Sequence, residues 1–211
     1  IYEDELLEVK KVSLPPIEPS ATSRALFGTE NTFGGAHRTS LKHSEKLAKY
    51  EEDHQTDMIV IISELWLDNP EVLQKFQVIL DGYSEDPPIA FIICGHFLSF
   101  SPNVTSGQKL REGFDTLAGM IEDVPNIKNQ TKFVFVPGPQ DLGSPKILPR
   151  ASLPQSLMEN FKKRIPGAFF AENPCRIQYC TKEIVVFRED MIPKLCRNAL
   201  KFPDDGQYYE H

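Results

Sequence analysis

Three short apolar runs, at residues 58–62, 89–94 and 133–136, place the strongest constraint on how this chain folds. Each run is rich in isoleucine, valine or phenylalanine, and nearly every position in it is apolar. Strands with one face in water alternate polar and apolar residues, whereas continuous apolar runs of this length are typical of strands buried on both faces. The sequence therefore predicts three strands in the interior of a sheet.

Helical patterns separate the three runs. Asn69 and Pro70 form a helix cap and first-turn pair, and apolar residues then recur at helical spacing as far as residues 81–82. The same spacing predicts a second helix over residues 110–121, before Pro125. This alternation of strand and helix predicts a layered α/β core with right-handed crossovers.

The alternation continues downstream of this core. A helix is predicted over residues 157–165, and paired strands at 176–180 and 183–188 flank Thr181-Lys182. A last helix is predicted to start at Asp190. We therefore expect one domain over residues 58–211.

The first 57 residues have a different character. Residues 1–19 begin with a strand-like acidic stretch and break up at prolines, so we expect them to be the end of a preceding unit and a linker. Residues 20–57 are expected to form a connecting loop followed by a charged, solvent-facing helix. The glycines of this loop lack the motifs of a phosphate-binding loop.

Charge and cysteine usage argue against several kinds of function. Lys and Arg number 23 against 30 for Asp and Glu, a net charge of -7, so strong unaided binding to DNA is not expected. The four cysteines contain no C-x2-C pair, which argues against a zinc ribbon. No apolar run approaches the roughly 20 residues that cross a bilayer, and no signal segment follows Ile1. We expect an intracellular chain or a fragment, without a membrane partner.

In open α/β sheets the functional site forms beyond the carboxyl ends of the strands. The turns after the three runs carry Ser-Glu-Leu-Trp-Leu-Asp, Gly-His-Phe-Leu-Ser and Pro-Gly-Pro-Gln-Asp. Their spacing resembles that of calcineurin-like metallophosphoesterases, whose turns carry D-x-H, G-D-x-x-D and G-N-H-D/E. The positions that match metal ligands or catalytic residues of that family are Glu64, Trp66, His96, Ser99, Pro139, Gln140 and Asp141.

In that family these positions hold two metal ions, but most of the residues here cannot do so. The indole N–H of Trp66 has no lone pair for a metal, and His96 stands where the family has the carboxylate that bridges the two ions. Gln140 replaces the catalytic histidine, which removes proton transfer at neutral pH. Only Glu64 and Asp141 keep carboxylates. We therefore predict no metal, no cofactor and no catalytic residue.

Four of these side chains are assigned a structural role instead. We expect Trp66 to be a buried packing residue over the mouth of the sheet. We expect His96 to form a hydrogen bond with a nearby carbonyl. Glu64 and Asp141 are expected to cap the helices that follow their strands.

A second resemblance extends over nearly the whole chain. It is carried by residues 133–141, 147–150 and above all by 173–190, Asn-Pro-Cys-Arg-Ile-Gln-Tyr-Cys-Thr-Lys-Glu-Ile-Val-Val-Phe-Arg-Glu-Asp. These residues resemble the B subunits of eukaryotic replicative DNA polymerases, in particular those of polymerase epsilon. The resemblance implies a degenerate calcineurin-like α/β sandwich that is incomplete at its C-terminus and is preceded by an OB fold, with residues 6–9 near the end of that OB-like unit.

The same resemblance implies a function. B subunits are non-catalytic accessory subunits that bind the zinc-containing C-terminal region of the catalytic subunit and stabilise the polymerase complex in the nucleus. The chain would then be a scaffold in DNA replication and repair, with DNA met through the complex and other replisome proteins as further candidate partners.

Two other functions remain open. A metal-dependent phosphodiesterase or nuclease would keep one metal through Glu64, His96 and Asp141. A DNA-binding module would use Arg150 and the basic run Lys162-Lys163-Arg164. Four basic residues in an acidic chain more often form a solvated face, which disfavours this last function.

Overall fold

The computed structural model describes residues 44–143, 147–197 and 199, together with residues 2–3, 6–7 and 9 near the N-terminus. The chain divides into two compact units, Ile1–His43 and Ser44–His211. In the first unit β1 (Tyr2–Glu3) pairs antiparallel with β2 (Leu6–Leu7). The remainder of the expected linker and connecting loop, from residue 10 to residue 43, lies outside the described residues.

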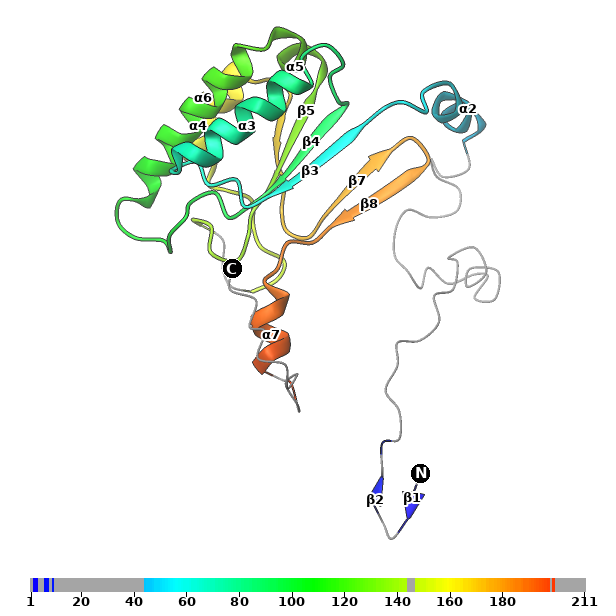
Figure 1. Ribbon diagram of the computed structural model, residues 1–211, viewed down its shortest axis with the longest axis vertical. Coiled ribbons are helices and arrows are strands. Elements are labelled where there is room, and N and C mark those ends of the chain that lie inside the picture. The colour runs from blue at the N-terminus through cyan, green and yellow to red at the C-terminus, as the bar shows by residue number, and fades with distance from the viewer. Residues whose placement is uncertain are drawn as a thin grey trace. The chain divides into compact units, whose positions relative to one another are not determined.

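A parallel four-stranded sheet forms the centre of the second unit (Figure 1). Its strands, in the order β3-β4-β5-β6, are β3 (Ile59–Ser63), β4 (Ala90–Cys94), β5 (Lys132–Val136) and β6 (Ala168–Phe170). The three predicted strands are confirmed. The fourth, β6, was not predicted, and it continues the sheet from β5.

Helices cover one face of this sheet. They are α3 (Pro70–Gly82), α4 (Ser106–Glu122), α5 (Pro125–Gln130) and α6 (Gln155–Arg164). Because the strand order follows the chain, crossovers of one hand place their helices on the same side, where Figure 1 shows α3, α4 and α6 together. The predicted cap is present, since the side chain of Asn69 accepts a hydrogen bond from the backbone N–H of Glu71 at 3.0 Å.

The burial predicted for the strands is right for β4 and wrong for β3. In β4, Phe91, Ile92 and Ile93 are fully buried. In β3, Ile61 is 63% exposed. The reason is position, because β3 is the edge strand of the sheet and its neighbour in the sheet is β4 alone. An apolar run therefore predicts a strand here, but it does not predict that both faces of the strand are buried.

Phenylalanine side chains fill the space between the sheet and the helices. The ring of Phe114 from α4 lies between 5.2 and 5.6 Å, centroid to centroid, from the rings of Phe97, Phe135, Phe161 and Phe170. Most of these pairs meet edge to face, the arrangement that aromatic quadrupoles favour. This packing ties α4 and α6 to β5 and β6, and it fixes the carboxyl ends of the strands.

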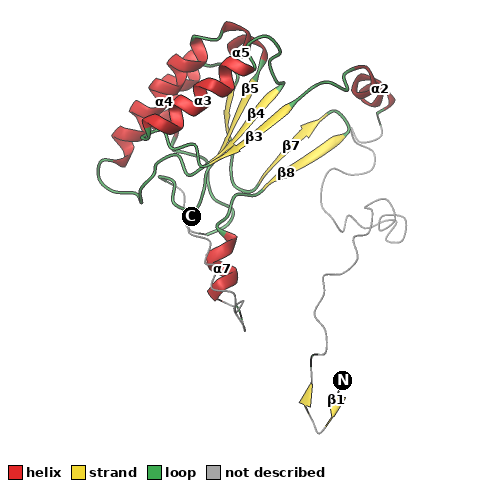
Figure 2. Ribbon diagram, viewed as in Figure 1, coloured by secondary structure: helices red, strands yellow, loops and turns green. Residues whose placement is uncertain are grey.

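A β-hairpin lies on the other face of the sheet (Figure 2). Its strands, β7 (Cys175–Tyr179) and β8 (Lys182–Val186), are antiparallel and flank Cys180-Thr181, close to the predicted turn. Apolar residues of the hairpin pack against Ile92, Cys94 and Val136 of the sheet. The predicted last helix follows as α7 (Met191–Arg197).

The charged helix predicted before the sheet is confirmed as α2 (Glu45–Asp53), with Ser44 as its N-cap. The carboxylate of Glu51 accepts hydrogen bonds from the backbone N–H and the hydroxyl of Thr181, at 2.8 and 2.7 Å. The helix is therefore attached to the tip of the hairpin. Within the described residues, every helix is too short or too polar to cross a membrane.

Candidate functional site

The carboxyl ends of β3, β4 and β5 bring Glu64, His96 and Asp141 to one edge of the sheet, as predicted. The backbone N–H of Glu64 donates to the carbonyl of Cys94, and that of Gly95 donates to the carbonyl of Val136, so the three turns continue the register of the strands. Glu64 has a φ of 62°, in the left-handed region that residues other than glycine seldom adopt. Such conformations occur most often at functional sites, which marks this edge of the sheet as the candidate site.

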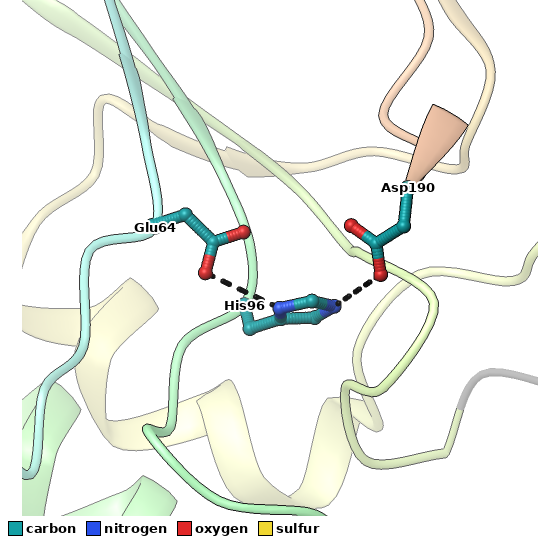
Figure 3. Close-up of side chains that lie close together, drawn as sticks. All are labelled: Glu64, His96 and Asp190. Atoms are coloured by element: carbon teal, nitrogen blue, oxygen red, sulfur yellow. Dashed lines mark hydrogen bonds and ion pairs between the residues drawn. The ribbon is translucent and has the colours of Figure 1, made fainter. Parts of the chain in front are cut away.

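His96 lies between two carboxylates (Figure 3). Its Nδ1 is 3.3 Å from Oε2 of Glu64, and its Nε2 is 3.7 Å from Oδ2 of Asp190, just before α7. The side chain is 13% exposed. The predicted hydrogen bond to a nearby carbonyl is therefore wrong, because Nδ1 faces the Glu64 carboxylate and the buried Nε2 has no hydrogen-bond partner among the described residues.

Arg188, which follows β8, binds the other oxygen of each of these two carboxylates. Its guanidinium donates to Oε1 of Glu64 and, at 2.7 Å, to Oδ1 of Asp190. Its Nε donates to the carbonyl of Gly95 at 2.7 Å. One arginine thus links the end of β3, the end of β4 and the segment that enters α7.

The charges of this cluster stabilise one another. Burial alone would raise the pKa of Glu64, but the hydrogen bond from Arg188 and the nearby His96 outweigh it and lower that pKa. Burial would likewise lower the pKa of Arg188, and the hydrogen bonds to Asp190 and Glu64 raise it instead. Both groups are therefore ionised near neutral pH, as an ion pair.

Asp141 lies outside this charged cluster and binds backbone N–H groups instead. Its carboxylate is buried and accepts hydrogen bonds from the backbone N–H groups of Phe97, at 2.8 Å, and Gly138, at 2.7 Å. Burial raises the pKa of Asp141, and the two N–H groups offset this only in part. The side chain joins the turns after β4 and β5 and caps neither of the following helices. The predicted capping role is also wrong for Glu64, which is bound to Arg188.

Comparison with known proteins identifies the family. Residues 59–211 match the family of B subunits of DNA polymerases alpha and epsilon. The chain is 46% identical, over 205 residues and 97% of its length, to "DNA polymerase epsilon subunit 2" of Bos taurus and to the protein of the same name in Homo sapiens. It is 39% identical over 99% of its length to the protein of that name in Drosophila melanogaster.

The chain belongs to the family of DNA polymerase alpha/epsilon B subunits. It spans 39% of the length of each of these three relatives. The predicted resemblance to the B subunits is therefore confirmed over nearly the whole chain.

Of the other positions predicted in this B-subunit chain, one bonds to the charged cluster and three lie apart from it. Trp66 is half-buried and donates its indole N–H to Oε2 of Glu64 at 3.0 Å, so the prediction of a buried packing residue is wrong. The hydroxyl of Ser99 donates to Asp68 at 2.5 Å. Pro139 is half-buried, and the exposed Gln140 accepts a hydrogen bond from the hydroxyl of Ser101.

The resemblance to metallophosphoesterases raises the question of a metal pair, and these residues do not fit one. One oxygen or nitrogen atom from each of Glu64, His96 and Asp190 lies within 4.8 Å of the other two, which is close enough for one ion. However, the Arg188 guanidinium already binds an oxygen of each carboxylate. Both oxygens of Asp141 are bound to backbone N–H groups. A bridging carboxylate between two ions is therefore lacking among the described residues.

Sequence reasoning missed Arg188 and Asp190 as site residues. Both stand at the end of the most specific run, residues 173–190, where they were given no role. The available signal was the change from the apolar end of β8 to the charged triplet Arg188-Glu189-Asp190 directly before a helix. Because β8 belongs to a separate two-stranded hairpin, the sequence alone could not place this triplet at the edge of the parallel sheet.

Arg150 does not belong to an exposed basic face. Its side chain is only 2% exposed and donates to the carboxylate of Glu189 at 2.6 Å, while Glu189 is 3% exposed. Burial opposes ionisation of Glu189, but hydrogen bonds from Arg150 and Lys194 outweigh it and lower its pKa to about 2. The DNA-binding function considered for Arg150 is thereby contradicted. Arg164 of the same candidate set binds Glu122.

Proposed function

We propose that this chain is part of a non-catalytic accessory B subunit of DNA polymerase epsilon. The observation that carries the proposal is the match to polymerase epsilon subunits across 97% of the chain. The chemistry of the site edge supports it, because the charged groups described there bind one another and leave no general base or metal pair in reach of a substrate. The domain would then be an inactivated calcineurin-like phosphoesterase fold, completed by sequence that the longer relatives contain.

The proposed role is to scaffold the polymerase in the nucleus during DNA replication and repair. The principal partner would be the zinc-containing C-terminal region of the catalytic subunit, with other replisome proteins as further partners. DNA would be met through the complex, since the chain has a net charge of -7 and its Arg150 is buried. The accessory protein would need no cofactor of its own.

Co-purification tests this proposal. The full-length protein that contains this chain is co-expressed with the C-terminal region of the polymerase epsilon catalytic subunit and purified in salt high enough to suppress charge-only contacts. Stoichiometric recovery of the two chains is the expected result. Failure to recover the complex, with the protein shown to be folded, would remove the scaffold function.

The second candidate function, a metal-dependent phosphodiesterase or nuclease, is favoured by one observation. Ligand atoms of Glu64, His96 and Asp190 lie close enough to share an ion. Asp141, the third residue of the set predicted from the sequence, is bound to Phe97 and Gly138 and does not join this group. The alternative is therefore weaker than the scaffold function.

Restoring the family histidine by Gln140→His is expected to give no phosphodiesterase activity. Gln140 is exposed and bonds to Ser101, and the bridging carboxylate would still be lacking at His96. Hydrolysis of a chromogenic phosphodiester with Mn²⁺ measures the effect, with the unmodified protein as the control. Manganese-dependent turnover by the variant alone would favour the enzyme.

A further inference from the structure

In the charged cluster at the strand ends, formed by Glu64, His96, Arg188 and Asp190, each carboxylate directs its two oxygen atoms to different side chains. Glu64 directs Oε1 to Arg188 and Oε2 to His96, and Asp190 directs Oδ1 to Arg188 and Oδ2 to His96. Each carboxylate therefore contacts one permanent cation and one imidazole, and Oε2 of Glu64 also accepts the indole N–H of Trp66. Figure 3 shows the imidazole between the two carboxylates, which come from segments far apart in the sequence.

Arg188 is fixed in this place by contacts outside the cluster. Its backbone N–H donates to Oδ1 of Asn173 at 3.1 Å, and its Nε donates to the carbonyl of Gly95 at 2.7 Å. Asn173 is fully buried and also donates to the carbonyls of Pro137 and Arg188. The side chain of Arg188, which is 12% exposed, is thus held from the segment before the hairpin and from the end of β4.

A divalent cation would compete with Arg188 for the carboxylates of Glu64 and Asp190. Imidazole nitrogen and carboxylate oxygen are ligands that Mn²⁺ and Zn²⁺ accept, and one such atom from each of the three residues lies within 4.8 Å of the others. The guanidinium binds one oxygen of both carboxylates and carries a positive charge that repels a second cation at this distance. The Nε2 atom of His96 is buried and has no hydrogen-bond partner among the described residues.

We infer that Arg188 is a built-in cation that takes the place of a metal ion, so that Glu64, His96 and Asp190 form a divalent-cation site only when its guanidinium is removed. The single positive charge of the arginine offsets part of the charge of the two carboxylates, and its contacts join the hairpin to the strand ends without any dependence on metal concentration. This inference concerns the free protein and does not require the proposed partner. It makes the exclusion of a single ion from this cluster a property of Arg188, which lies outside the three predicted strand-end turns.

The test compares Mn²⁺ binding by the full-length protein and by its Arg188→Gln variant, using electron paramagnetic resonance to measure free Mn²⁺. The unmodified protein should bind no ion at this site, and Arg188→Gln should bind one ion per chain. Mn²⁺ should also raise the thermal unfolding temperature of the variant, because a ligand that binds only the folded state stabilises it. The unmodified protein should show no such shift.

Two further variants make the result specific. Adding His96→Ala to Arg188→Gln should abolish the new binding. Arg176→Gln, which removes an exposed arginine from the same hairpin, is the matched control and should bind no ion. If Arg188→Gln does not fold, Arg188→Met replaces it, since an unbranched apolar side chain fills similar space without charge.

Two outcomes would overturn the inference. One is stoichiometric Mn²⁺ binding by the unmodified protein that disappears in His96→Ala. The other is a folded Arg188→Gln or Arg188→Met variant that binds no Mn²⁺. Neither outcome bears on co-purification with the catalytic subunit, so failure here is distinguishable from failure of the scaffold function.

Discussion

Replacing Glu189 by alanine is expected to lower the free energy of unfolding by about 3 to 5 kcal/mol, the usual cost of leaving a buried charge without its partner. Glu189 and Arg150 are 3% and 2% exposed, and their charged atoms are 2.6 Å apart. Nε of Arg150 already lacks a hydrogen-bond partner among the described residues. Without the carboxylate, the guanidinium would lose its main source of compensation. Chemical unfolding of the full-length protein measures the change.

An exposed ion pair supplies the control for this experiment. Glu159 and Lys163 are 64% and 71% exposed on α6, so Glu159→Ala should cost less than about 0.5 kcal/mol. The same glutamate-to-alanine change is thus made once in a buried ion pair and once in an exposed ion pair. Equal effects of Glu189→Ala and Glu159→Ala would contradict the buried pair, since burial is the main difference between them.

The same pair predicts a pH dependence. The pKa of Glu189 is about 2 in the folded protein, below the value of about 4.3 expected in the unfolded chain. A depressed pKa stabilises the fold above the unfolded value, and this contribution is lost as the pH falls from about 4.3 toward 2. The unmodified protein should therefore lose more stability between about pH 5 and pH 3 than Glu189→Ala. A parallel loss in both proteins would show that other carboxylates determine the acid sensitivity.

The fold was largely predictable because its signals are local. A cap at Asn69 and the apolar spacing behind it specify α3 without knowledge of any neighbour. The burial of β3 was not predictable, because the position of a strand at the edge of a sheet depends on which other strands pair with it. The strand β6 was missed because it has only three residues, of which Phe169 is 55% exposed. So short a strand forms through its pairing with β5 and not through its own pattern.

The site was predictable in its position but not in its chemistry. Parallel strands end at one edge, so Glu64, His96 and Asp141 could be placed together from the sequence alone. The role of Glu64 depends on Arg188, which is 124 residues away along the chain and reaches it only through the hairpin. The role of Asp141 depends on two backbone N–H groups, which nearly every residue offers and no sequence pattern marks. The departures from the metallophosphoesterase pattern could be seen in the sequence, whereas the groups that hold these turns together could not.

The contacts that join these turns would suit the proposed accessory protein, which works through its surface. In a metal-dependent enzyme, the strand ends are held together by ions that also perform the chemistry. Here the strand ends are joined by Arg188, and the turns after β4 and β5 are joined by Asp141. Side chains and backbone hydrogen bonds between the turns therefore hold this edge of the sheet, and a rigid domain of this kind can present partners with a constant surface.

Gly95→Ala is expected to destabilise the protein by at least about 3 kcal/mol, since overpacking costs about 1 to 3 kcal/mol and each of two unpaired buried N–H groups adds about 1 to 3 kcal/mol. A Cβ atom at Gly95 would lie 1.8 Å from Oδ2 of Asp141 and 2.8 Å from the backbone nitrogen of Gly138. The carboxylate would have to move, and it could then no longer accept from both Phe97 and Gly138.

The matched control for this last prediction is Gly82→Ala, measured by the same chemical unfolding of the full-length protein. A Cβ atom at Gly82 meets nothing within 4 Å, and Gly82 is the last residue of α3. Alanine there should be neutral or stabilising by up to about 1 kcal/mol, because it restricts the unfolded chain more than glycine does. The two glycine-to-alanine changes should therefore differ in sign or by several kcal/mol. If Gly95→Ala left the unfolding midpoint unchanged, Asp141 could leave its place without cost, and it would not be the group that joins the turns after β4 and β5.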